Sequence, residues 1–398
     1  MKRILLHDYA GHPFQVQLSR YLAASGNQVL HLYAGSNQTP HGNLAKHPSD
    51  LFNFNIRGVF IREKYQKKAL IKRWKQELEY GSLLEKEIDA FRPDVMISAN
   101  TPLDAQSIAL NACKRRGIKF IFWMQDITGQ ATYLILRRKM PGLGHLVGKY
   151  YIELENRILR RCEHIISISQ DFLPYLNIAG VSQDRISVIQ NWMPLDEIIP
   201  CERLNPWAIA NQFEDKFVFL YSGAMDMKHN PKVLMDLAEG LKQNSDVIVC
   251  VISEGIGASW LNQQQKNLQL KNLILLNYQP FEKISQVLCS GHVLLATLES
   301  DAGVISVPSK ILSYACAGRP MLLSVPKENL AARIVEINKL GIVVPPGDTK
   351  AYVEAAKKLY IDSELRKIFS INSRKYAETN FDINQVGQQF LKIINQYP

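Results

Sequence analysis

Short apolar runs alternate with amphipathic segments along almost the whole chain of 398 residues. Apolar runs of about four to eight residues are typical of buried strands, and the longer amphipathic stretches between them predict helices. In the first half the predicted strands are RILLH, QVLHLY, DVMIS, KFIFWM and HIISIS. In the second half they are KFVFLYSG, DVIVCVIS, LILLNY, HVLLATL and PMLLSV. Strands that alternate with helices indicate βαβ units and parallel sheets.

The two series of strands indicate two domains. A connection marked by prolines, VIQNWMPLDEIIPCERLNPWAI, joins them. We therefore predict an α/β fold of two doubly wound, Rossmann-like domains that face a cleft. The expected division is residues 1–198, residues 199–380, and a terminal helix in residues 381–398 that docks back on the first domain.

The composition predicts a globular protein that stays in the cytoplasm. Hydrophobic residues make up 46% of the chain, enough for a large core. The opening MKRILLHDYAGHPF holds too short an apolar run for a signal peptide, and no run approaches the roughly 18 apolar residues of a membrane span. The six cysteines are scattered without metal-ligand spacing, so we expect reduced core thiols.

The formal net charge of +10 falls mostly in the first half of the chain. Residues 57–75, RGVFIREKYQKKALIKRWK, carry eight basic side chains among aliphatic and aromatic ones, and TYLILRRKM repeats the combination. Such segments suit the surface of an anionic membrane, although a solvated helix face has the same composition. Nucleic acid is not expected as a partner, because no recognition motif accompanies the charge.

The second half places small and charged residues where its strands end. Ligands of open α/β sheets bind beyond the carboxyl ends of the strands, so these residues are candidates for a nucleotide-sized site. They are Gly223, Lys228, Glu254, Gly255, Glu299, Gly303 and Val304.

A helix follows these residues in SVPSKILSYACAGRPMLLSV. Pro308 and Ser309 predict its start, with Ser309 as N-cap, and the Gly-Arg-Pro that follows predicts its end. Its unpaired N–H groups, with Lys310 in the first turn, suit a phosphate. The alternative is that Ser309 only caps the helix and Lys310 is solvated.

Several motifs, in their order along the chain, resemble those of the family 4 glycosyltransferases, retaining enzymes of two Rossmann-like domains (the GT-B fold). The motifs are ENRILRRCEHIISIS, ISVIQNW, YSGAMDMKHNP, VISEGIG, VPSKILSYACAGRP, NLAARIVE, GIVVPPGD and FDINQVGQQF. QDITGQATYLILRRKMPGLG and VPSKILSYACAGRP look most like bacterial enzymes of O-antigen, capsule and colanic-acid-type polysaccharide assembly, in particular the N-acetyl-L-fucosamine transferases.

This resemblance implies transfer of a sugar from a nucleotide-sugar donor, UDP-linked, to a polyprenyl-diphosphate-linked saccharide. It also implies a peripheral protein at the inner face of the cytoplasmic membrane. Lys228, Lys310 and backbone N–H groups would meet the charge that develops on the diphosphate when the sugar-phosphate bond breaks.

The chain departs from the family at two acidic positions. Many members carry two glutamates eight positions apart around this helix, where this chain has Ile305 and Ser313. Glu299, with Asp301 two residues further on, is the acid that could take the sugar-binding role, and Ser313 could bind a ribose hydroxyl. There is no D-x-D, so we expect no essential metal and no cofactor.

The acceptor is expected in the first domain. FIFWMQDITG puts Gln125 and Asp126 at a strand end, and Asp126 is the candidate for binding or deprotonating the acceptor hydroxyl, with a capping role as the alternative. A base is not strictly required, because retaining transferases of this type are thought to act without an enzyme nucleophile. Gly11 and His12, in the loop after the first strand, are the other acceptor candidates.

Other functions fit less well. A nucleotide-sugar 2-epimerase shares the two-domain fold, and a non-catalytic sugar-nucleotide-binding assembly partner is compatible with the missing second glutamate. A periplasmic binding protein would need a signal peptide. A Rossmann dehydrogenase is excluded because PGLGHLVG has the wrong glycine spacing and precedes no strand–helix unit.

Overall fold

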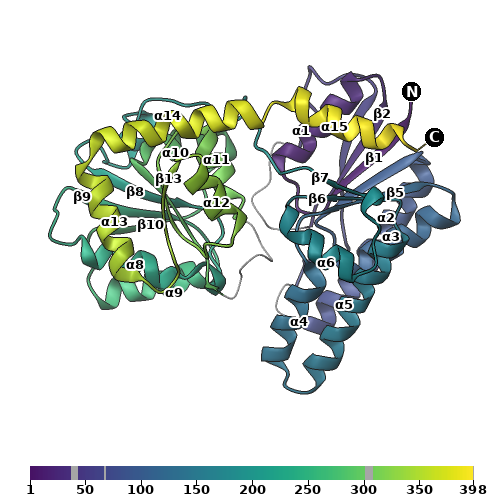
Figure 1. Ribbon diagram of the computed structural model, residues 1–398, viewed down its shortest axis with the longest axis horizontal. Coiled ribbons are helices and arrows are strands. Elements are labelled where there is room, and N and C mark those ends of the chain that lie inside the picture. The colour runs from purple at the N-terminus through teal and green to yellow at the C-terminus, as the bar shows by residue number, and fades with distance from the viewer. Residues whose placement is uncertain (37–43, 67–68, 301–307, 398) are drawn as a thin grey trace. The chain divides into compact units, whose positions relative to one another are not determined.

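The computed structural model describes residues 1–36, 44–66, 69–300 and 308–397. The chain forms two compact units, each with one parallel sheet surrounded by helices (Figure 1). Unit 1 comprises Met1–Asn191 and Ile383–Pro398, and unit 2 comprises Trp192–Asp382. The predicted fold of two Rossmann-like domains is confirmed.

Unit 1 is built on a seven-stranded sheet in the order β3-β2-β1-β4-β5-β6-β7. Every neighbouring pair of strands is parallel. The strand order reverses between β1 and β4, so a crevice is expected beyond the carboxyl ends of these two strands. The strands are β1 (Arg3–Asp8), β2 (Gln28–Ala34), β3 (Phe54–Val59), β4 (Val95–Ala99), β5 (Lys119–Met124), β6 (His164–Ser167) and β7 (Ile186–Val188).

The last helix of the chain belongs to unit 1. It packs beside the first helix (Figure 1). Its buried Phe390 meets the Trp123 ring edge-on, with the ring centroids 4.7 Å apart. The α-helices of the unit are α1 (Pro13–Ala24), α2 (Leu70–Phe91), α3 (Leu103–Arg115), α4 (Thr128–Lys139), α5 (Leu143–Arg161), α6 (Leu173–Ile178) and α15 (Ile383–Asn395). Two 3-10 turns complete it, η1 (Gln170–Phe172) and η2 (Gln183–Arg185).

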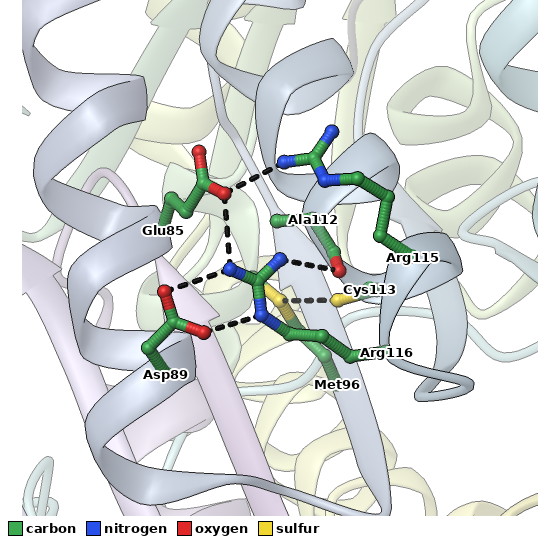
Figure 2. Close-up of polar contacts among 7 residues, drawn as sticks. All are labelled: Glu85, Asp89, Met96, Ala112, Cys113, Arg115 and Arg116. Atoms are coloured by element: carbon green, nitrogen blue, oxygen red, sulfur yellow. Dashed lines mark hydrogen bonds and ion pairs between the residues drawn. The ribbon is translucent and has the colours of Figure 1, made fainter.

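Helices α2 and α3 are joined on their exposed side by ion pairs (Figure 2). The Arg116 guanidinium donates to both Asp89 and Glu85, and Arg115 donates to Glu85 at 2.6 Å. Exposed pairs of this kind add little stability. The closer packing lies at Gly81, where an added Cβ would come within 3.1 Å of the Ala105 Cα. This contact fixes the position of α2 on the unit.

Helices α4 and α5 form a hairpin whose close approach depends on glycines (Figure 1). A Cβ on Gly144 would lie 2.0 Å from the Leu136 carbonyl oxygen, and one on Gly148 would lie 2.8 Å from the Tyr133 Cα. The glycines of PGLGHLVG, which have the wrong spacing for a dinucleotide loop, thus serve helix packing.

Unit 2 is built on a six-stranded parallel sheet in the order β10-β9-β8-β11-β12-β13, which reverses between β8 and β11. The strands are β8 (Phe217–Ser222), β9 (Val247–Ile252), β10 (Leu273–Leu276), β11 (Val293–Thr297), β12 (Met321–Ser324) and β13 (Gly341–Val344). The α-helices are α7 (Pro206–Ala210), α8 (Pro231–Gly240), α9 (Ile256–Asn267), α10 (Ile284–Ser290), α11 (Lys310–Cys316), α12 (Leu330–Ile337), α13 (Thr349–Ile361) and α14 (Ser363–Asn380). Two 3-10 turns are η3 (Met227–His229) and η4 (Phe281–Lys283).

The structure places the boundary between the units at Asn191 and Trp192, a few residues before the expected 198. Trp192 is fully buried, and the Ile199 N–H donates to the Ser285 hydroxyl at 3.0 Å. All the predicted strands are present, together with three edge strands that the apolar pattern did not predict.

All six cysteines are free thiols, and five of them are buried. Among the described helices, none combines the length and the hydropathy needed to cross a bilayer.

Candidate functional site

Lys310 has the most unusual environment in unit 2. Its Nζ is buried 3.6 Å from the centroid of the Tyr221 ring and has no hydrogen-bond partner among the described residues. Burial lowers the pKa of Lys310 well below its usual 10.5, and the like charge of Lys228 lowers it further. A buried ammonium is costly unless an anion accompanies it. The site is therefore suited to a negatively charged ligand.

Gly223, directly after β8, leaves room for this ammonium. Its φ of +133° is one that side chains rarely adopt, and an added Cβ would lie 3.3 Å from the Lys310 Cε. Gly223, which the sequence analysis named only from its place at a strand end, therefore lies beside the Lys310 side chain.

The loop that carries Lys228 is fixed by hydrogen bonds to two other strand ends. The Glu299 N–H, beyond β11, donates to the Lys228 carbonyl at 2.8 Å. The Ser253 hydroxyl, beyond β9, donates to the Gly223 carbonyl at 2.6 Å. A Cβ on Gly255 would lie 2.7 Å from the Met225 carbonyl oxygen, so this position also requires glycine. The ends of β8, β9 and β11 thus meet where the strand order reverses.

His229 is a member of this cluster that the sequence analysis missed. Its Nδ1 accepts a hydrogen bond from the Asp226 N–H at 3.0 Å, and the Thr297 hydroxyl donates to its carbonyl. Burial, followed by the charges of Lys310 and Lys228, lowers the pKa of His229 to about 3, so the ring is neutral. The sequence could have indicated His229 as a site residue, because it directly follows Lys228 in YSGAMDMKHNP.

The other predicted donor residues are less enclosed. Glu254 and Ser309 are exposed, Glu299 is partly buried, and Ser313 is partly buried on α11. Gly303 and Val304 lie outside the described residues.

The expected cap by the Ser309 side chain is wrong. Ser309 has φ −60° and ψ −20°, already helical, whereas a capping side chain needs an extended backbone to reach back to the first turn. The helix that follows has seven residues, so the positive charge of the site comes mainly from lysine side chains.

Unit 1 has a polar pocket of about 270 Å³ at its own strand-order reversal. Of the residues expected to bind the acceptor, Gln125 and Asp126 line this pocket, whereas Gly11 and His12 are not among its lining residues. The pocket is lined by Tyr9, Tyr65, Arg73, Asn100, Thr101, Pro102, Phe122, Gln125, Asp126 and Thr128.

The Gln125 side chain is hydrogen-bonded to another residue of unit 1. Its amide exchanges two hydrogen bonds with the Asn191 amide, at 2.5 and 3.2 Å. Asp126 is exposed on the loop before α4 and is the carboxylate that lines the polar pocket. A polar ligand in this pocket therefore has Asp126 as its anionic neighbour.

The position of Asp126 depends on Glu155. This buried carboxylate accepts hydrogen bonds from the N–H groups of Thr128 and Gly129, both at 3.0 Å, and from the Tyr175 hydroxyl at 2.7 Å. These bonds lower the pKa of Glu155, but burial outweighs them and raises it to about 7. Glu155 thereby anchors the first turn of α4 next to Asp126.

Arg73 and Tyr65 are pocket residues that the strand-end argument missed, because they lie on and before α2. The Arg73 Nε and the Tyr65 hydroxyl both donate to the buried Glu77 carboxylate, at 2.7 and 3.0 Å. The sequence feature that could have pointed to Arg73 and Tyr65 was the basic and aromatic composition of residues 57–75. Asn100 follows β4 directly, so the strand-end rule applied to β4 would have found it.

The loop after β1 is held in place by hydrogen bonds to the Asp8 side chain. The buried Asp8 carboxylate accepts hydrogen bonds from the N–H groups of Ala10 and His12 and from the Asn100 amide. Gly11 has a φ of +75°, which favours glycine. Over the described ranges, no group of three or more His, Cys, Asp or Glu side chains is placed to hold a metal ion.

Comparison with known proteins identifies the family. The model of Glycosyltransferase Family 4 matches residues 15–197, and the model of Glycosyl transferases group 1 matches residues 207–376. Together they span most of both units. The chain is a group 1 glycosyltransferase of the GT-B type.

Relatives of this glycosyltransferase have low sequence identity to it. The putative colanic acid biosynthesis glycosyl transferase WcaI of Escherichia coli is 20% identical over 76% of this chain and 74% of its own length. The O-antigen chain mannosyltransferase C of Escherichia coli is 25% identical over 62% of this chain and 64% of its own length.

Solved structures share the fold of this glycosyltransferase. HepE of Anabaena, solved in complex with UDP-glucose, superposes with a TM-score of 0.71 at 14% identity, over the full length of both chains. This similarity supports the two-domain GT-B architecture.

Proposed function

We propose that this glycosyltransferase is a retaining enzyme that transfers a sugar from a UDP-sugar to a polyprenyl-diphosphate-linked saccharide in bacterial surface polysaccharide biosynthesis. The main observation in support is the buried Lys310 ammonium, which lacks a hydrogen-bond partner in the described part of the chain and lies at the strand-order reversal of unit 2. The names of the colanic acid and O-antigen relatives support the pathway class. The UDP-glucose complex of HepE supports the donor class.

The donor diphosphate would bind against Lys310 and Lys228. When the bond between the sugar C1 and the diphosphate oxygen breaks, negative charge builds on the leaving diphosphate, and preorganised cations stabilise it. Gly223 leaves room for the Lys310 side chain, and Gly255 allows the loop after β9 to approach the Met225 carbonyl closely. Glu299 and Ser313 are proposed to bind the donor sugar and the ribose.

The acceptor would bind in the polar pocket of unit 1. Its hydroxyl oxygen forms the new bond to C1, and its proton leaves to Asp126 or to the departing diphosphate oxygen. Asp126 is the proposed binding group or base, with Gln125 holding the wall of the pocket through Asn191. No metal or cofactor is part of this proposal.

A transfer assay tests the proposal. Purified protein is incubated with a polyprenyl-diphosphate-linked N-acetylhexosamine and with UDP-sugars, including UDP-N-acetyl-L-fucosamine, and UDP release is measured with magnesium or with a chelator. We expect acceptor-dependent UDP release in both conditions, with retention at C1, and a loss of at least about tenfold in Lys228→Ala. Release from GDP-sugars only, or inversion at C1, would reject it.

A further inference from the structure

Unit 1 carries an apolar groove of about 1360 Å³ between the first turns of α2 and the hairpin of α4 and α5. Its lining includes large exposed side chains, among them Ile71 (73% exposed), Leu143 (61%), Ile135 (53%) and Trp74 (42%). Soluble proteins rarely expose a large continuous apolar patch without a function. The groove is therefore a candidate binding surface for an apolar ligand.

The walls of the apolar groove are preformed. Gly144 and Gly148 fix the spacing of α4 and α5, and Glu155 pins the start of α4. The Tyr151 hydroxyl donates to Asp104 at 2.8 Å and ties α5 to α3. A ligand would therefore enter an existing trough with little cost in ordering it.

The apolar groove adjoins the polar pocket. Arg73, Pro102 and Thr128 line both cavities. A single ligand that fills both needs a polar end beside Asp126 and an apolar chain attached to it. A protein segment that only covered apolar surface would leave the polar pocket unused.

Basic side chains border the apolar groove. Lys72, Arg73 and Lys75 line it from α2, and Arg137, Arg138 and Lys139 form the last turn of α4. The carboxylate in the lining is Glu77, which is already paired with Arg73, and Lys72 is paired with Glu63 outside the lining. The excess of positive charge suits an anionic group at the junction of chain and head.

We propose that the apolar groove binds the isoprenoid chain of the lipid-linked acceptor, while its diphosphate lies near Arg73 and its sugar occupies the polar pocket. This inference rests on the proposed function and specifies where its acceptor binds. The groove is larger than the roughly 300–1,000 Å³ typical of sites for small ligands, in keeping with a long chain. Ile135 and Trp74 contact the chain and determine the preference for a lipid-linked acceptor.

Titration calorimetry with farnesyl diphosphate and with inorganic diphosphate, both in the presence of saturating UDP that occupies the proposed donor site of unit 2, tests this inference. We expect the wild type to bind farnesyl diphosphate at least about tenfold more tightly than inorganic diphosphate, because the chain buries apolar surface. Ile135→Asn and Trp74→Ser should abolish this preference and leave the affinity for inorganic diphosphate unchanged. Ile371→Asn, at a similarly exposed position on α14, is the matched control and should retain the preference.

Two results would overturn the inference. One is equal affinity for the two diphosphates, or an unchanged preference in both groove variants. The other is that the groove variants bind phosphatidylglycerol vesicles more weakly but keep their affinity for farnesyl diphosphate, which would make the groove a membrane contact. UDP titrated into the same proteins reports on unit 2 separately, so failure of the donor site is distinguishable from failure of the groove.

Discussion

The ammonium of Lys310 lies where water does not reach it, on the face of an aromatic ring and beside a second lysine. A cation over a ring gains about 1–2 kcal/mol, less than the cost of burying a charge. The sequence predicted Lys310 as a phosphate ligand from its position after Pro308 and Ser309. It could not predict the contact with Tyr221, because that depends on how β8 and α11 pack.

Gly223→Ala tests the space beside Lys310. The added methyl would crowd the lysine and strain a backbone with φ +133°, so we expect UDP affinity to fall at least about tenfold. Calorimetry measures this. Gly347→Ala is the control, because Gly347 also has a positive φ, +91°, but open space around it. Equal UDP affinity in the two variants would show that Gly223 has no role at the site.

Glu155 makes stability depend on pH. Burial raises its pKa from 4.5 to about 7. Between these values the unfolded carboxyl is ionised while the folded one keeps its proton. The stability that Glu155 contributes is therefore fully present below pH 4.5 and is lost as the pH rises to about 7. Over this range the wild type should lose about 3 kcal/mol of unfolding free energy relative to Glu155→Gln. Urea unfolding of both proteins measures it, and parallel pH profiles would contradict the prediction.

At the scale of elements, the apolar pattern found the central strands and the edge strand β10, whose sequence LILL is apolar throughout, and missed three others. The missed strands are β3, β7 and β13, which all lie at sheet edges. Their side chains are partly exposed, so selection for continuous apolar runs is weak there. Only some residues of the polar pocket could be predicted from the sequence. Asp126 was found because it follows a buried strand. Arg73 was missed because it reaches the pocket from a helix that packs there only in the folded unit.

Gly144→Ala tests the packing of α4 on α5. The new Cβ would lie 2.0 Å from the Leu136 carbonyl oxygen, which belongs to the backbone and cannot move aside cheaply. We expect a loss of about 1–3 kcal/mol in unfolding free energy. The gain in helix propensity, about 0.5–1 kcal/mol, does not offset this. Denaturant unfolding measures the change, with Lys149→Ala on the exposed side of α5 as control, and equal stability of the two variants would refute it.

At the scale of the whole molecule, unit 1 is completed by the end of the chain. The apolar periodicity of FDINQVGQQFLKIIN predicted a docked helix, and in the structure α15 packs beside α1. Trp123, at the centre of the unit, contacts Phe390 across more than 260 residues of sequence. Unit 1 therefore depends on both ends of the chain, and truncation before α15 would expose its core.

Phe390→Ala tests this dependence. Phe390 is fully buried, so its truncation should cost about 3–5 kcal/mol and lower the midpoint of thermal unfolding. Phe52→Ala is the control in the same unit, because Phe52 is 92% exposed. Thermal unfolding followed by circular dichroism compares them. If both variants unfold at the same temperature as the wild type, α15 does not stabilise unit 1.

The central claim is that unit 2 binds a nucleoside diphosphate through Lys310, and titration calorimetry with UDP tests it most directly. The wild type should bind UDP without metal and take up protons at pH values near the lowered pKa of Lys310, because the bound anion favours the charged form of this lysine. The affinity should therefore fall as the pH rises. Lys310→Met should lose at least about tenfold in affinity and the proton uptake, while Lys271→Met, at an exposed position, should retain both. Unchanged UDP affinity in Lys310→Met would contradict the account.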